Sequence, residues 1–84
     1  MDWIEKDNKL TAEFIFEDFG QAWAFMTEVA MLAERKNHHP EWKNVWNRVT
    51  IWLTSHDEGN MVTEKDKKMA DGIDKIYDRY QYFK

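Results

Sequence analysis

The sequence contains no cysteine, one proline and three glycines among its 84 residues. The absence of cysteine excludes a disulfide framework and a thiolate zinc site, and it is typical of proteins from a reducing compartment. No apolar run approaches the roughly 18 residues that a membrane-spanning helix needs, and residues 1–6 lack the basic and then apolar pattern of a signal peptide. We therefore expect a cytoplasmic protein with no membrane partner.

Positive charge is also scarce. Lysine and arginine total 12 against 16 aspartates and glutamates, which gives a net charge of −4. Nucleic-acid binders normally carry a broad positive field, so we expect no direct nucleic-acid binding. We expect one domain over residues 1–84. Because so small a domain buries only roughly 60% of the surface of its unfolded chain, self-association would help to stabilise it.

Periodicity in the sequence predicts three strands, with a fourth short one possible. Residues 3–6 and 10–16 are typical of strands, and residues 7–9 between them tolerate turn conformations. Apolar residues alternate with other residues over 45–54, which predicts a third strand. A short strand at residues 61–62 is also possible. The side chains expected on the core faces are Ala12, Phe14, Phe16, Val45, Val49, Ile51 and Leu53.

Two helices are predicted. The first runs over residues 19–36, with Asp18 as its N-cap and Gln21 completing a capping box, and the second follows Thr63 with Asp66 at its third position. The expected buried residues are Ala22, Phe25, Met26, Val29, Leu32 and Ala33 in the first helix, and Met69, Ile73, Ile76, Tyr77 and Tyr80 in the second. We predict an α+β two-layer sandwich, in which an antiparallel sheet of three to four strands packs both helices on one face.

The three histidines lie in two loop-like segments. His38 and His39 follow the first helix, and His56 follows the third strand. Asn37 is expected to end the helix in a left-handed conformation, while Pro40 restricts His39 to extended angles. Imidazole is the side chain whose unperturbed pKa lies near neutrality. If the two segments converge, one imidazole could donate a proton while another accepts one.

Other interpretations of these residues are open. The histidines could be ordinary exposed loop residues. Three imidazoles could also hold zinc, but no spaced zinc signature is present and we expect no metal. Glu34 could orient His38 or be a solvated surface acid, and Asp66 is expected to cap its helix rather than contact a ligand. Packing in a core or interface is the commoner use of indole, but four tryptophans could stack on a flat heterocycle. They are Trp23, Trp42, Trp46 and Trp52.

The spacing of these residues resembles the signature of the pterin-4a-carbinolamine dehydratases. Glu34 is followed after three residues by His38-His39-Pro40, and Trp46, His56 and Asp66 come later in the same order. The resemblance covers nearly the whole chain. It implies an antiparallel sheet with helices on one face, and a homodimer formed by strand pairing or a homotetramer formed through a helix. Longer members carry an additional N-terminal helix, so this chain resembles a short form.

The resemblance also implies a reaction and site residues. The reaction is the dehydration of 4a-hydroxytetrahydrobiopterin to quinonoid dihydrobiopterin, which recycles the pterin cofactor of aromatic amino acid hydroxylases. His38 and His56 correspond to the acid–base pair and His39 to the histidine that positions the ring, with no metal or cofactor required. The residues that correspond to substrate-binding positions are Glu34, Asn37, Pro40, Thr54, Ser55 and Asp57.

A different function class remains open, because some animal members act as a dimerisation cofactor for a homeodomain transcription factor. In a purely non-enzymatic interaction module the histidines would be free to change. This chain has all three and no others, which favours the enzyme.

Overall fold

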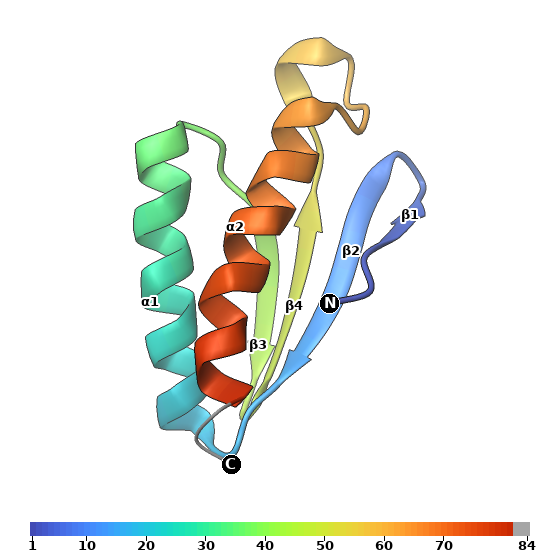
Figure 1. Cartoon of the computed structure of the whole chain (residues 1–84). Coiled ribbons are helices and arrows are strands. Elements are labelled where there is room, and N and C mark those ends of the chain that lie inside the picture. Colours follow the sequence, from blue (N-terminus) through green and yellow to red (C-terminus); the bar gives the residue numbers. More distant parts are fainter. Residues whose placement is uncertain (82–84) are drawn as a thin grey trace.

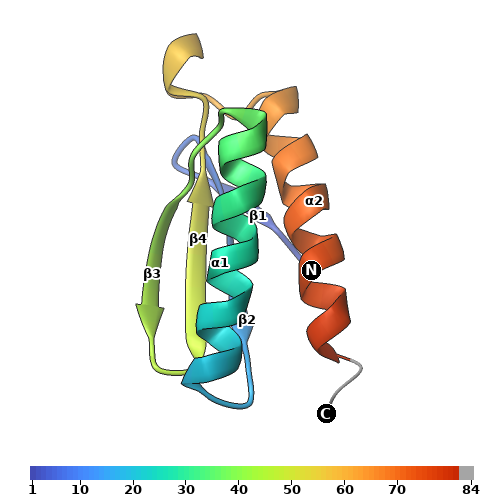
Figure 2. The same cartoon turned by 90° about the vertical axis from the view of Figure 1, so that its left-hand side faces the viewer.

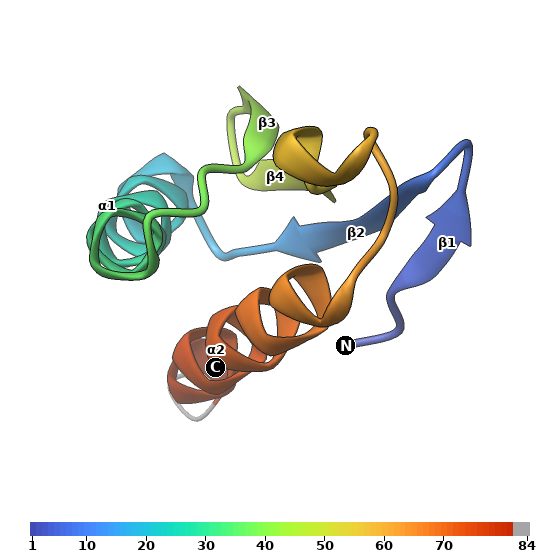
Figure 3. The same ribbon diagram turned by 90° about the horizontal axis from the view of Figure 1, so that it is seen from above.

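The computed structural model describes residues 1–81. Its elements are β1 (Ile4–Lys6), β2 (Lys9–Ile15), α1 (Phe19–Lys36), β3 (Glu41–Val45), β4 (Arg48–Leu53), the 3₁₀ helix η1 (His56–Glu58) and α2 (Glu64–Gln81). The strands form one sheet, and both helices lie on the same face of it (Figures 2 and 3). The α+β two-layer sandwich with four antiparallel strands is therefore confirmed.

The strands lie in the order β1-β2-β4-β3, and each neighbouring pair is antiparallel. Directly paired residues place their side chains on the same face of a sheet. Phe14 of β2 is paired with Val49 of β4, and both are fully buried beneath the helices. Thr11 is paired with Trp52, and these side chains lie on the face that no helix covers. The alternation seen in the sequence thus corresponds to a covered and an open face.

The predicted strand over residues 45–54 is wrong at its start. The chain turns back at Trp46, so β3 and β4 form a hairpin. Trp46 has a φ of 50°, a conformation that bulky residues rarely adopt. The Asn44 side chain stabilises the turn by donating to the carbonyls of Trp46 at 3.0 Å and Arg48 at 2.9 Å. Val45 is therefore paired with Arg48 on the open face, and it is 48% exposed rather than part of the core.

The short strand considered at residues 61–62 is a single bridge between Ser55 and Met61. The backbone N–H of Ser55 donates to the Met61 carbonyl at 3.0 Å. This bridge closes the loop that contains η1. It therefore sets where the chain leaves the sheet and turns toward α2.

Helix α1 begins and ends where the sequence predicts. The carboxylate of Asp18 accepts a hydrogen bond from the Gln21 backbone N–H at 2.8 Å, and Asn37 ends the helix in the left-handed conformation. The six residues predicted to face the core are all buried, namely Ala22, Phe25, Met26, Val29, Leu32 and Ala33.

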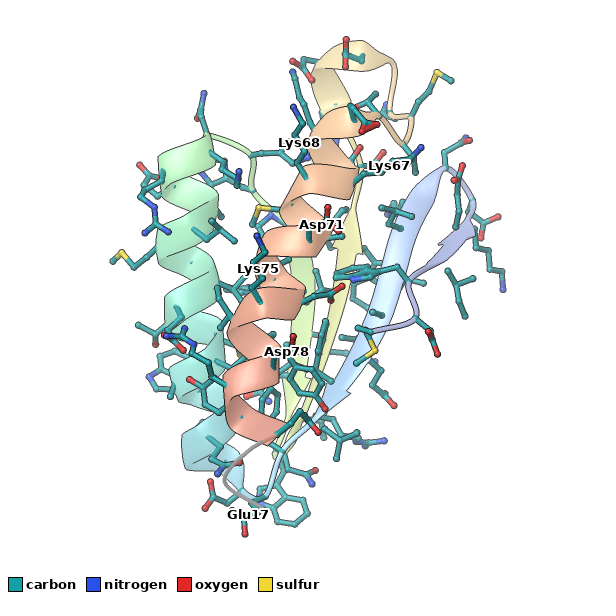
Figure 4. All side chains as sticks on the ribbon, viewed as in Figure 1. Glu17, Lys67, Lys68, Asp71, Lys75 and Asp78 are labelled. Atoms are coloured by element: carbon teal, nitrogen blue, oxygen red, sulfur yellow. The ribbon has the colours of Figure 1, made fainter. Side chains whose placement is uncertain are left out.

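Helix α2 packs against α1 and the sheet. Met69 and Ile73 are buried, and Ile76, Tyr77 and Tyr80 are partly buried against the same core. A side chain at Gly72 would place its Cβ 2.8 Å from Leu32 Cδ2, so the glycine allows a close approach of the two helices. Figure 4 shows the opposite, charged side of α2, which carries Lys68, Asp71, Lys75 and Asp78. Within residues 1–81, no helix has both the length and the apolar character required to cross a membrane.

The fold brings three chain segments together at one end of the molecule. The end of α1, the η1 segment that follows β4, and the start of α2 all lie at the top of Figure 1. The aromatic part of the core lies further along the layers, where the Phe14 and Phe16 rings contact the Tyr77 ring edge to face. The aromatic core therefore lies apart from the end of the molecule at which these three segments meet.

Candidate active site

A pocket with a volume of about 290 Å³ lies where these three segments meet. It is lined by Asn37, His38, His39, His56, Asp57 and Lys65. The two histidine segments, which are far apart in the sequence, therefore contribute to one pocket. Its volume is close to the lower end of the range that is common for small-molecule sites.

A larger cavity of about 400 Å³ lies between the two helices and is lined by Gln21, Glu28, Arg79 and Tyr80. The Tyr80 hydroxyl donates to the Glu28 carboxylate at 2.6 Å, and Arg79 forms an ion pair with the same carboxylate. Burial, with the bond to Glu28, raises the pKa of Tyr80 to about 12. This phenol stays protonated near neutrality, so we place the candidate acid–base chemistry in the smaller pocket.

His38 is held in place by the end of α1. Asn37 adopts φ 50° and ψ 44°, which reverses the chain direction. The His38 backbone N–H then donates to the Ala33 carbonyl at 3.1 Å, and the Asn37 backbone N–H donates to the Glu34 backbone carbonyl at 3.2 Å. These are the bonds of a left-handed helix end. They direct the His38 side chain inward, toward the start of α2.

The His38 ring contacts a buried carboxylate. Its Nε2 lies 2.6 Å from Asp66 Oδ1, and the Asp66 side chain is fully buried. A carboxylate acceptor fixes the imidazole tautomer by keeping a proton on the ring nitrogen that it contacts. We assign that proton to Nε2, which leaves Nδ1 as the ring atom of His38 available for proton exchange.

Asp66 is itself surrounded by donors. Its Oδ2 accepts hydrogen bonds from the Ser55 hydroxyl and from the Thr63 backbone N–H, each at 2.8 Å. The Ser55 and Thr63 hydroxyls are 2.6 Å apart. Within residues 1–81, every buried side-chain nitrogen or oxygen has a hydrogen-bond partner. This pairing offsets the cost of burying the carboxylate and fixes the position of His38.

The sequence predicted only part of the role of Asp66. It does cap α2, through Thr63, but its other oxygen binds His38. The contact with His38 was missed because it joins residues 28 positions apart. The available signal was that a cap uses one carboxylate oxygen and leaves the second free.

His39 lies on the outer side of the pocket. Its Nε2 is 3.0 Å from Glu34 Oε1, and both side chains are exposed. Of the two interpretations of Glu34, an acid that orients His38 is wrong, because the helix end turns His38 inward to Asp66. Glu34 is an exposed surface acid. It is placed to orient His39.

His56 begins η1 directly after the end of the sheet. Its Nδ1 lies 2.8 Å from Asn60 Oδ1, a contact within the same turn. Gly59 ends η1 with a φ of 80°, which other residues rarely adopt. The ring is exposed, and Nε2 is the atom left for contact with a ligand.

Asp57 and Lys65 form an ion pair at the pocket, with 2.7 Å between Oδ2 and Nζ. The hydrogen bond from Lys65 lowers the pKa of Asp57, and the bond to Asp57 raises the pKa of Lys65. The sequence predicted Asp57 but not Lys65. The signal that could have found Lys65 is its place in the first turn of α2, where acidic side chains are favoured over cations.

Four of the predicted substrate-binding residues are not among the side chains that line the pocket, namely Glu34, Pro40, Thr54 and Ser55. The Thr54 hydroxyl donates to the Asn8 carbonyl at 2.9 Å, and Ser55 is fully buried beside Asp66. Their contacts with a ligand remain predictions.

None of the four tryptophans considered for stacking lines the pocket among the described residues. Residues 1–81 also contain no cluster of three or more histidine, cysteine or acidic side chains placed to hold a metal ion.

Comparison with known families gives a clear result. The sequence pattern of the family described as pterin 4 alpha carbinolamine dehydratase matches residues 1–76. The chain belongs to this family. A relative from Rhizorhabdus wittichii, which carries the dehydratase name provisionally, is 48% identical over 89% of this chain and 78% of its own length. A relative from Prochlorococcus marinus with the same provisional name is 46% identical over 88% of this chain and 77% of its own length.

Two solved structures share the fold. One is described as a transcriptional coactivator/pterin dehydratase from Brucella Melitensis, and it is 44% identical with a TM-score of 0.85 over 89% of this chain and 81% of that chain. The other is a pterin dehydratase-like protein identified as a RuBisCO assembly factor, which is 24% identical with a TM-score of 0.79 over 92% of this chain and 90% of that chain. The second likeness supports the fold alone.

Proposed function

We propose that this chain dehydrates 4a-hydroxytetrahydrobiopterin to quinonoid dihydrobiopterin, a hydro-lyase reaction. In this reaction the bond between C4a and the hydroxyl oxygen breaks, and a proton from a general acid completes the leaving water. A base removes the proton from N5, and the C4a–N5 double bond forms. Proton donation and acceptance balance, so the reaction requires no other reactant. The observation that supports this proposal is that all three imidazoles line one pocket.

In this proposal His38 and His56 are the acid–base pair. His38 is oriented by Asp66, which leaves Nδ1 for proton exchange, and His56 has Nε2 free of its contact with Asn60. Imidazoles as a class can donate or accept protons near neutral pH. His39, held by Glu34, would bind and position the pterin ring.

The proposal is tested by stopped-flow absorbance of freshly formed carbinolamine. We expect catalytic amounts of the protein to accelerate its decay. A variant in which His38 and His56 are both replaced by alanine is the control, and it should not accelerate the decay. The proposal is wrong if the wild-type protein leaves the decay rate unchanged.

The physiological role would be to recycle the pterin of an aromatic amino acid hydroxylase. We also propose a homodimer or homotetramer. In the described sheet β1 and β3 are the edge strands, so their outer backbone groups have no neighbouring strand. Light scattering during size-exclusion chromatography would test this, and a monomer at micromolar concentration would contradict it.

The alternative function is a non-enzymatic interaction module. One observation favours it, because α1 exposes Phe19 at 49%, Trp23 at 58% and Met31 at 57%. Exposed apolar groups of this size are common at protein interfaces. The two functions predict different behaviour of Trp23→Ala, which should weaken partner capture in the module but leave turnover intact in the enzyme.

A further inference from the structure

The turn that carries His56 has few attachments to the rest of the molecule. Helix η1 contains no buried residue, so apolar packing does not hold it in place. The backbone N–H groups of Glu58 and Asn60 both donate to the Ser55 carbonyl, and the His56 ring contacts Asn60. Ser55 itself is anchored, because it is fully buried and its hydroxyl donates to Asp66 of α2. The bonds to its carbonyl shape the turn but do not hold residues 57–60 against the helices.

Within the described chain, one side-chain hydrogen bond links residues 56–60 to another element. Lys65, in the first turn of α2, donates from Nζ to Asp57 Oδ2 over 2.7 Å. Lys65 also lines the pocket that contains the three histidines. Its position is unfavourable for the helix itself, because the first turn of a helix favours acidic side chains over cations. The stability of α2 therefore does not account for a lysine at this position.

We propose that Lys65 is a positioning residue for the dehydration, because its bond to Asp57 fixes the turn that presents His56 to the substrate. The catalytic part of this inference rests on the proposed function, whereas the restraint on the turn is a property of the protein without ligand. A misplacement of about 1 Å can cost roughly 100-fold in rate. An exposed ion pair adds little to folding stability. Loss of Lys65 should therefore reduce turnover much more than it affects folding.

The decisive variant is Lys65→Met, which removes the charge and keeps an apolar stem. Lys67→Met is the matched control, because Lys67 is exposed two positions further along α2 and is not part of the pocket lining (Figure 4). In Lys65→Met we expect faster amide hydrogen exchange over residues 56–60, and a kcat about tenfold lower with little change in KM. Lys67→Met should match the wild-type protein in both measurements. Lys65→Arg keeps the cation and should retain most of the protection and turnover.

Wild-type exchange over residues 56–60 in Lys65→Met would overturn the proposal. The double variant Asp57→Ala/Lys65→Met should lose no more kcat than Asp57→Ala alone, because Asp57→Ala already removes the restraint that Lys65 supplies. Multiplied losses in the double variant would also overturn it. If the wild-type protein has no dehydratase activity, the proposed function fails, and the exchange comparison of Lys65→Met with Lys67→Met decides the restraint by itself.

Discussion

His38 and His56 line the same pocket, but they are held there in different ways. The His38 side chain is 13% exposed and contacts a carboxylate with no exposed surface. His56 belongs to a 3₁₀ helix that contains no buried residue. The first histidine is thus mostly buried and bound to a buried carboxylate, and the second is carried by a surface turn. The difference teaches that the two halves of one candidate acid–base pair should respond differently to mutation.

The comparison predicts its largest effect for His56→Ala. General acid–base catalysis contributes about 10²- to 10⁴-fold to a rate, so we expect kcat to fall by at least roughly 100-fold. The urea midpoint of unfolding should stay at the wild-type value, because the ring is exposed. Stopped-flow turnover and urea titration measure the two quantities. His39→Ala is the matched variant, and equal losses of turnover and binding in both variants would contradict the assigned roles.

Asp66→Ala tests the buried side of the comparison. The change removes the acceptor for the Thr63 backbone N–H, which caps α2, and leaves the His38 ring without its partner. The Ser55 hydroxyl keeps only its contact with the Thr63 hydroxyl. Loss of a cap costs about 1 kcal/mol, and an unsatisfied buried group costs about 1–3 kcal/mol. We expect the free energy of unfolding to fall by about 2–3 kcal/mol, together with turnover.

The control for this variant is Asp71→Ala, an exposed acid on the same helix (Figure 4). Its urea midpoint should match the wild-type protein. If Asp66→Ala also unfolds at the wild-type midpoint, the buried network does not stabilise the fold in the way the structure suggests.

The helices and the first hairpin could be predicted because local signals specify them. Asp18 and Asn37 are residues whose chemistry suits the two ends of α1, and the structure uses both. The β3–β4 hairpin could not be predicted in this way. Its turn places Trp46 at a φ of 50°, which side-chain preference argues against, and it depends on bonds from Asn44. The apolar alternation continued through the turn and concealed it.

The candidate site was predictable in its histidines but not in their partners. A loop histidine is recognised by its type, whereas its orientation depends on contacts made by distant residues. Asp66 meets His38 only after α2 packs beside the end of α1, and Lys65 meets Asp57 only after the loop from η1 folds back on the start of α2. Such contacts are set by tertiary packing, so the sequence pattern indicates the site without showing how it is held.

His39→Ala should have an intermediate effect. The ring is 59% exposed and is oriented by an exposed glutamate. We expect the affinity for a pterin to fall about tenfold with a smaller change in kcat, because losing one hydrogen bond to a ligand costs roughly 1.5 kcal/mol. Isothermal titration with a non-reactive pterin measures the affinity. A loss confined to kcat would move His39 into the acid–base pair and remove the distinction drawn here.

Two carboxylates extend the comparison to pH. The bond from Lys65 lowers the pKa of Asp57 below 3.8, so its contribution to stability is present above that value and is lost as pH falls through the lowered pKa. Burial raises the pKa of Asp74, so its contribution has the opposite sign and improves as pH falls through the raised pKa. Carbon-13 NMR of the carboxyl groups should show the two midpoints on opposite sides of 3.8. Lys65→Met should raise the Asp57 midpoint alone, and an unchanged midpoint would contradict the ion pair.

The smallest effect is expected at Gly72, where α1 and α2 approach each other. An alanine Cβ there would lie 2.8 Å from Leu32 Cδ2, so the leucine must shift. Alanine gains about 1 kcal/mol of helix propensity, and moving a side chain off its rotamer costs a similar amount. We expect the free energy of unfolding of Gly72→Ala to stay within about 1 kcal/mol of wild type. Gly20→Ala is the matched control, because its Cβ would meet only Asp18 Oδ1 at 3.5 Å. Gly20→Ala should have a higher urea midpoint than Gly72→Ala. A higher midpoint for Gly72→Ala would show that Leu32 adjusts without cost.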